Sequence, residues 1–199
     1  IILVIQVISS LILIKEYKNP KNALILFVIY AYHLLFAFFY YSIPTDAQSM
    51  YQQGLDLVLT SYPNPGNQVV VFVAYICNKY LHLSYLGVTI LFASISYISF
   101  WMLFQIIQNH KIKYLWLILL IPSMHFWTAG FGKDCLVFFF IVTLLYNVQK
   151  NKLHYILLAL IGIYLLRPHI AALFGFIYII TLLFSNHTSF KVKLIATIT

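Results

Sequence analysis

Charged residues are scarce in this chain, yet two of them stand side by side at the start of an apolar run. Only 8% of the 199 residues are charged, and Lys133-Asp134 directly follows a Gly-Phe-Gly sequence. Free backbone N–H groups at a helix N-terminus, glycines that allow close approach and a lysine favour binding of a phosphate. The alternative is that Lys133 extends to lipid phosphates. Asp134 is expected to cap a helix over residues 135–148.

The sequence Arg167-Pro168-His169 repeats this arrangement within a second apolar stretch. Proline suits the first position of a new helix, so Arg167 is expected at a helix N-terminus, where the macrodipole disfavours a cation. An anionic ligand would remove that conflict, and arginine binds phosphate through two parallel hydrogen bonds. A structural arginine that binds loop carbonyls is the alternative.

Three further residues are candidates for proton transfer or ligand binding. Asp46 follows Pro44-Thr45 and is either a general base or a carboxylate that complements a helix dipole. His125 and His169 are either acid–base groups or satisfied polar groups at helix ends. Neither His125 nor His169 has metal-ligand spacing to a cysteine or carboxylate, so no metal site and no cofactor are expected, with a divalent cation left open.

The composition determines which elements must position these residues. Hydrophobic residues make up 63% of the chain, and apolar runs long enough to cross a bilayer recur, which predicts an all-α, polytopic transmembrane helical bundle. The chain is interpreted as a single transmembrane domain over residues 1–199 that is truncated at both ends. Cys77 and Cys135 lie in apolar surroundings and are expected to be buried thiols.

The placement of the basic residues predicts the topology of the bundle. Nine of the twelve lie in short loops between apolar segments, as the positive-inside rule expects of cytoplasmic loops, so the net charge of +8 does not indicate nucleic-acid binding. These nine are Lys15, Lys18, Lys21, Lys111, Lys113, Lys150, Lys152, Lys191 and Lys193. With these loops inside, we expect crossings to end at residue 14 and to span residues 23–43, 84–107, 114–128 and 135–148.

Two apolar segments do not fit as simple crossings. Residues 67–82 contain only a short apolar run and predict an external or re-entrant helix within an external loop, residues 44–82, that carries amphipathic helices. In that loop Thr45 and Gln48 have the spacing of a capping box, and Tyr51, Leu55, Val58 and Leu59 fall on one helical face. Residues 155–184 predict two short helices that meet at an outward-facing tip, with a single kinked span as the alternative.

This topology brings the scarce polar residues to the external side. The residues concerned are Asp46, Asp56, His125, Lys133, Asp134, Arg167 and His169. A polar site beneath the outer leaflet follows from that convergence.

Three patches of the sequence resemble a known family. Asp46 with Tyr51, the stretch PSMHFWTAGFGKD and the stretch LLRPHIAAL resemble bacterial multi-pass proteins of polysaccharide assembly, of the Wzy and EpsG polymerase kind and similar in layout to GT-C glycosyltransferases. The resemblance implies Asp46 as general base, and Lys133 and Arg167 as ligands of a lipid-linked phosphate. Ala47 follows Asp46 where the family has paired acids, and the large extramembrane domain of many such enzymes is absent.

The resulting expectation is an inverting membrane glycosyltransferase or O-antigen-type polymerase in the bacterial inner membrane. Asp46, His125 and Asp134 are the predicted catalytic residues, and Lys133, Arg167 and His169 are the predicted phosphate ligands. The predicted partners are a polyprenyl-phosphate-linked saccharide and membrane lipid, with room for other polysaccharide-assembly proteins. A transporter or flippase for an anionic lipid-linked saccharide remains the alternative, because broken helices whose N-termini face an anion also occur in transporters.

Overall fold

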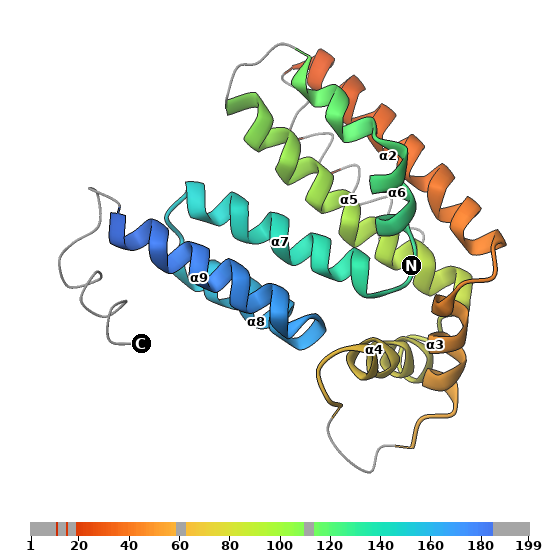
Figure 1. Cartoon of the computed structure of the whole chain (residues 1–199). Coiled ribbons are helices and arrows are strands. Elements are labelled where there is room, and N and C mark those ends of the chain that lie inside the picture. Colours follow the sequence, from red (N-terminus) through yellow and green to blue (C-terminus); the bar gives the residue numbers. More distant parts are fainter. Residues whose placement is uncertain (1–10, 12–14, 16–18, 59–62, 110–113, 185–199) are drawn as a thin grey trace.

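The described part of the chain consists of helices joined by turns and short connections. A computed structural model describes residues 11, 15, 19–58, 63–109 and 114–184, and no strand occurs among them. The helices are α2 (Pro20–Ser42), α3 (Asp46–Leu55), α4 (Asn67–Lys79), α5 (Tyr85–Asn109), the 3-10 helix η1 (Leu115–Leu120), α6 (Pro122–Ala129), α7 (Lys133–Gln149), α8 (Leu153–Leu166) and α9 (Pro168–Phe184) (Figure 1). The expected all-α class is confirmed for these residues.

Two of the described helices are long and apolar enough to cross a membrane. They are α2, with 23 residues, and α5, with 25 residues. The helices α6 and α7 pass the same test only as a pair, and they meet at an angle of 112°. The described residues therefore contain two such helices, or three if the bent pair forms one span. The expected crossing that ends at residue 14, and the lysines at positions 111, 113, 191 and 193, lie outside the described residues.

The crossing expected over residues 114–128 is broken, which corrects the prediction of one continuous helix. The chain forms η1, leaves helical geometry at Ile121 (φ −62°, ψ 119°) and resumes as α6 at Pro122. A proline ring clashes with the backbone of the preceding residue and drives it out of the α region. Pro122 therefore ends one short helix and begins the next.

The apolar stretch around Arg167 forms a helical hairpin. Arg167 has extended geometry (φ −147°, ψ 85°), and Pro168 begins α9. Ile156, Ala159 and Ile163 of α8 share a buried cluster with Ala171 of α9, so α9 folds back along α8 (Figure 1). The predicted pair of short helices is confirmed, and the alternative of one kinked span is excluded.

The segment after α2 forms a small helical layer across one end of the molecule. Helix α3 begins after Thr45, as expected, but the Thr45 side chain makes no capping hydrogen bond and the helix ends at Leu55. Its buried face is Ala47, Tyr51 and Gly54, whereas Leu55 and Val58 are exposed. The predicted face of Tyr51, Leu55 and Val58 was therefore wrong beyond Tyr51, and Leu59 lies outside the described residues.

Close helix contact explains why Gly54 belongs to the buried face. A Cβ atom at Gly54 would lie 2.6 Å from the Cβ of Ala74 and 3.0 Å from the carbonyl oxygen of Val71, both on α4. Only a residue without a side chain lets α3 approach α4 this closely. With 13 residues, or about 20 Å of rise, α4 is too short to cross a membrane, as expected for this segment.

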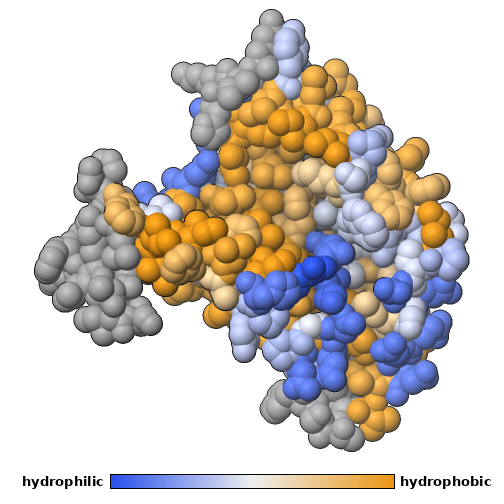
Figure 2. Space-filling view, viewed as in Figure 1, coloured by the Kyte–Doolittle hydropathy of each residue, from blue (hydrophilic) through white to orange (hydrophobic). Residues whose placement is uncertain are grey.

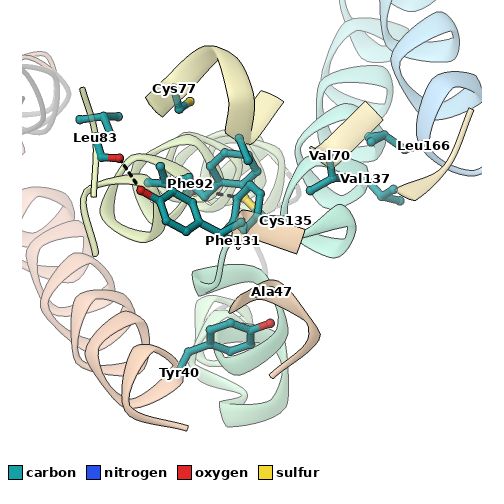
Figure 3. Close-up of a cluster of buried hydrophobic side chains, with 13 residues drawn as sticks. Tyr40, Ala47, Val70, Cys77, Leu83, Phe92, Phe131, Cys135, Val137 and Leu166 are labelled. Carbon is teal, nitrogen blue, oxygen red and sulfur yellow. Dashed lines mark hydrogen bonds between the residues drawn. The ribbon is translucent and has the colours of Figure 1, made fainter. Parts of the chain in front are cut away.

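A buried core joins the α3–α4 layer to the longer helices. Tyr40, Ala47, Val70, Phe92, Phe131 and Leu166 belong to one cluster that draws on six helical segments and the α6–α7 turn (Figure 3). The Tyr51 hydroxyl donates to the carbonyl of Leu83 at 2.8 Å, and the Gly66 N–H donates to the carbonyl of Leu165 at 2.8 Å. These bonds hold α3 against the start of α5, and the start of α4 against the end of α8.

The two ends of the molecule differ in polarity. Figure 2 shows hydrophilic surface gathered where α3 and α4 lie, and apolar surface over much of α2, α5 and the helices α7 to α9. Lys133 begins α7, whereas Lys150 and Lys152 follow its other end, about 25 Å away by helical rise. Lys133 therefore lies at the α3–α4 end of α7, whereas Lys150 and Lys152 lie at its opposite end.

Candidate functional site

A cavity of about 460 Å³ lies between the α3–α4 layer and the helix breaks. We call it the charged cavity. Its lining comes from four parts of the chain that are far apart in sequence. The residues are Tyr40, Thr45, Asp46, Ala47, Met50, Asn67, Phe126, Trp127, Phe131, Gly132, Lys133, Asp134 and Arg167. Four of the six predicted site residues, namely Asp46, Lys133, Asp134 and Arg167, thus share one cavity.

Asp134 and Arg167 form an ion pair inside the charged cavity. Arg167 Nη2 donates to Asp134 Oδ1 at 2.5 Å, and about a third of the arginine side chain and half of the aspartate side chain remain exposed. Helix α7 begins at Lys133 with Gly132 as its N-cap, so the expected capping role of Asp134 was wrong. The Asp134 side chain neutralises Arg167 and does not cap the helix.

The Gly-Phe-Gly turn before Lys133 has three distinct roles. A Cβ at Gly130 would overlap the ring of Tyr40, so this glycine allows the α6–α7 turn to pack on α2. Phe131 is fully buried and packs edge-on against Phe92, with ring centroids 4.9 Å apart. Gly132 has extended geometry and nothing within 4 Å of its would-be Cβ. Open space therefore lies beside the first turn of α7.

Within the part of the chain that the structure describes, neither Lys133 nor Asp46 has an ion-pair partner. The Asp134–Arg167 pair is the one ion pair among the residues that the structure describes. Asp46 is exposed in the first turn of α3, and Lys133 is partly exposed in the first turn of α7. A carboxylate and an ammonium group thus face the same cavity without neutralising each other through direct contact, and both are available to a ligand.

His125 does not line the charged cavity. It is fully buried on α6, where its Nδ1 lies 3.0 Å from Nδ1 of His33 and its Nε2 donates to the carbonyl of Leu119 at 2.5 Å. His33 Nε2 lies 2.6 Å from the Ser96 hydroxyl. His125 was expected to be either an acid–base group or a polar group with satisfied hydrogen bonds. These contacts fit the satisfied polar group. Nothing local in the sequence distinguishes His33 from its apolar run, so its role could not be predicted.

His169 also lies apart from the lining of the charged cavity. It is exposed as the second residue of α9 and is absent from that lining. Among the described residues, no three His, Cys, Asp or Glu side chains come together as a metal-ligand set.

Asn67 and Trp127 line the charged cavity although neither was a predicted site residue. Asn67 begins α4, and Trp127 follows Phe126 near the end of α6.

Comparison with known proteins adds no relative to this description. A scan against protein-family models, a search of curated proteins and a search of solved structures found no match to the chain. The function must therefore be argued from the charged cavity itself. That cavity combines a free cation, a free carboxylate, a paired arginine and an exposed indole.

Proposed function

We propose that this chain is a membrane glycosyltransferase or polysaccharide polymerase that uses polyprenyl-(pyro)phosphate-linked sugars at the outer face of the bacterial inner membrane. The observation that carries the proposal is the shared cavity of Asp46, Lys133, Asp134 and Arg167. A sugar phosphate needs a cation for its phosphate, and the hydroxyl that attacks it needs a base. The charged cavity supplies both from separate helices.

The proposed reaction is a displacement at the anomeric carbon of the donor sugar. A hydroxyl oxygen of the acceptor bonds to that carbon while the bond from the carbon to the phosphate oxygen breaks, and the electron pair leaves with the phosphate. Asp46 accepts the hydroxyl proton. Lys133 stabilises the charge that develops on the leaving phosphate. Attack from the side opposite the phosphate inverts the configuration.

Arg167 and Asp134 act together in this proposal. Arg167 is bound to Asp134 through Nη2, which leaves its other terminal nitrogen to donate to a phosphate oxygen. Asp134 is therefore a positioning residue for Arg167. His125 and His169 have no part in the proposed reaction, because neither lines the charged cavity.

The membrane placement is part of the same proposal. Helices α2 and α5 cross the bilayer, the bent pair α6–α7 and the α8–α9 hairpin complete a multi-pass bundle, and the α3–α4 layer lies along the outer surface. The lysines of the α7–α8 turn then face the cytoplasm, as the positive-inside rule expects. A polyprenyl donor can reach the charged cavity from the outer leaflet.

A reconstituted assay tests the proposed activity. The purified protein in lipid vesicles, without any transmembrane gradient, is given polyprenyl-pyrophosphate-linked oligosaccharide extracted from the producing cells, and glycan products are separated by size. Asp46→Asn should lower the turnover by about 10²- to 10⁴-fold, the usual contribution of a general base. Lys133→Met should lower it by at least tenfold. Arg167→Lys should also lower it, because lysine cannot form two parallel hydrogen bonds.

Two residues outside the charged cavity serve as controls for the variants Asp46→Asn and Lys133→Met. Asp56 lies at the other end of α3, and Lys150 lies beyond the other end of α7; both are exposed and outside the charged cavity. Asp56→Asn and Lys150→Met should keep full turnover. Full turnover in a correctly inserted Asp46→Asn variant would remove Asp46 from the reaction. Donor that is moved across the vesicle membrane but never consumed would favour the transporter alternative.

A further inference from the structure

A second hollow lies on the opposite side of the start of α3. It has a volume of about 400 Å³ and is lined by Tyr41, Ser42, Ile43, Pro44, Gln48 and Tyr85. We call it the tyrosine hollow. Both this volume and that of the charged cavity fall in the range of about 300–1,000 Å³ that is usual for small-molecule sites.

The first turn of α3 forms the wall between the two cavities. Thr45, Asp46 and Ala47 line the charged cavity, whereas Pro44 before them and Gln48 after them line the tyrosine hollow. Residues two apart on an α-helix project about 200° from each other, so Asp46 and Gln48 leave the helix on nearly opposite sides. One turn of helix therefore separates the two cavities, and the proposed base stands in that turn.

The two cavities differ in charge. The charged cavity holds two carboxylates and two basic side chains, whereas none of the described residues that line the tyrosine hollow is charged. The hollow offers phenol rings, a hydroxyl and an amide. This chemistry suits a neutral ligand rich in hydroxyl groups, because aromatic faces pack against sugar C–H groups and amides bind sugar hydroxyls.

The aromatic side of the tyrosine hollow is held in place from behind. The rings of Tyr41 and Tyr85 have centroids 5.4 Å apart and planes inclined by 33°. Tyr85 also packs on buried Tyr51, at 5.5 Å, and the Tyr51 hydroxyl is bound to the carbonyl of Leu83. Tyr85 is thus held against a buried ring, and Tyr41 packs on Tyr85, which lowers the ordering entropy that a ligand would have to offset.

We infer that the tyrosine hollow binds the acceptor saccharide, an uncharged oligosaccharide. Its end passes the N-terminus of α3, where Pro44 lines the hollow and the next residue, Thr45, lines the charged cavity, and its terminal hydroxyl attacks the donor there. This inference rests on the proposed function, because a transferase must hold two substrates beside one base. The acceptor oxygen bonds to the donor anomeric carbon, its proton passes to Asp46, and the phosphate departs with the electron pair. Tyr41 and Gln48 then determine affinity for the acceptor and leave affinity for the donor unchanged.

A binding experiment tests the tyrosine hollow without requiring catalysis. Ser42 is exposed in the hollow, and the full chain carrying Ser42→Cys in lipid vesicles is labelled with a maleimide. Soluble oligosaccharide released by mild acid from the lipid-linked pool of the producing cells should slow labelling at least fivefold. Adding Tyr41→Ala should abolish this protection, whereas Tyr41→Phe should keep it. A cysteine at exposed Asp56 should not be protected.

A kinetic experiment then separates the two proposals. Tyr41→Ala should raise the acceptor KM at least tenfold with the donor KM unchanged. The control is Tyr80→Ala, because Tyr80 is 65% exposed and lines neither cavity. Protection of Ser42→Cys without any donor consumption would support the saccharide site and overturn the proposed transfer. Transfer without protection, with an unchanged acceptor KM in Tyr41→Ala, would overturn the acceptor site and leave the transfer standing.

Discussion

The Nδ1 atoms of His33 and His125 lie 3.0 Å apart in the core formed by α2, α5 and α6. Because His125 Nε2 donates to the carbonyl of Leu119, a neutral His125 accepts at Nδ1 and His33 donates to it. Both rings are fully buried, and the Phe100 ring stacks on His125 at 4.3 Å between centroids. The pair links two helices through residues that are 92 positions apart in sequence.

The histidine pair should contribute to stability and not to catalysis. His33→Leu leaves the buried Nδ1 of His125 without a donor, which should cost about 1–3 kcal/mol. The double variant His33→Leu/His125→Phe removes both polar partners and should recover part of that loss. Apparent melting temperatures in detergent measure both effects. A loss of transfer in His125→Gln at unchanged melting temperature would instead assign the ring to the chemistry.

The open space beside Gly132 should be needed by the ligand and not by the fold. Gly132→Ala meets nothing within 4 Å and keeps an extended backbone that any residue adopts. Its methyl group would enter the charged cavity beside the first turn of α7, so the donor KM should rise at least fivefold while the melting temperature stays constant. Gly175→Ala, which also meets nothing within 4 Å but lies on α9, is the control. An unchanged donor KM would show that no phosphate approaches this turn.

The close approach of α3 to α4 should depend on Gly54. Gly54→Ala forces a Cβ to within 2.6 Å of Ala74 Cβ, and overpacking of this kind costs about 1–3 kcal/mol. Because α3 carries Asp46, turnover should fall as well. Gly87→Ala on α5 is the matched change, since its Cβ would make only ordinary contacts of 3.4 Å or more. Equal melting temperatures for the two variants would contradict the packing argument.

Thiol labelling should show on which side of the membrane the α3–α4 end and the α7–α8 turn each lie. Cys77 and Cys135 are both buried, and burial raises the pKa of the Cys77 thiol, so the reactive thiolate is scarce and the native background should be low. In spheroplasts, a membrane-impermeant maleimide should label Asp56→Cys. It should label Lys150→Cys only after permeabilisation. The reverse pattern would place the charged cavity on the cytoplasmic side. It would exclude a donor that reaches the cavity from the outer leaflet.

The helix positions could be predicted because they depend on local properties. The apolar runs of α2 and α5 exceed the thickness of a bilayer core, and Pro168 breaks a run that would otherwise continue. Pro122 breaks its run by the same mechanism. The break at Pro122 was not predicted because no charged residue marks it, whereas Arg167 marks the break at Pro168.

The contacts within the candidate site depend on packing between distant segments, which the sequence pattern does not encode. Topology alone placed Asp46, Lys133 and Arg167 at one end, but not the pairing of Arg167 with Asp134. The tyrosine hollow could not be predicted, since Tyr41 and Tyr85 look like any tyrosines near a helix end until α3 separates them from the charged cavity.

The Asp134–Arg167 pair also has a consequence for how the protein is made. The two residues are 33 positions apart, so at about 5–20 residues per second a ribosome adds the arginine roughly 2–7 s after the aspartate. Throughout that interval the nascent carboxylate has no guanidinium to bind. The charged cavity is therefore among the last parts of residues 20–167 to mature, after the helices around the two histidines have already been synthesised.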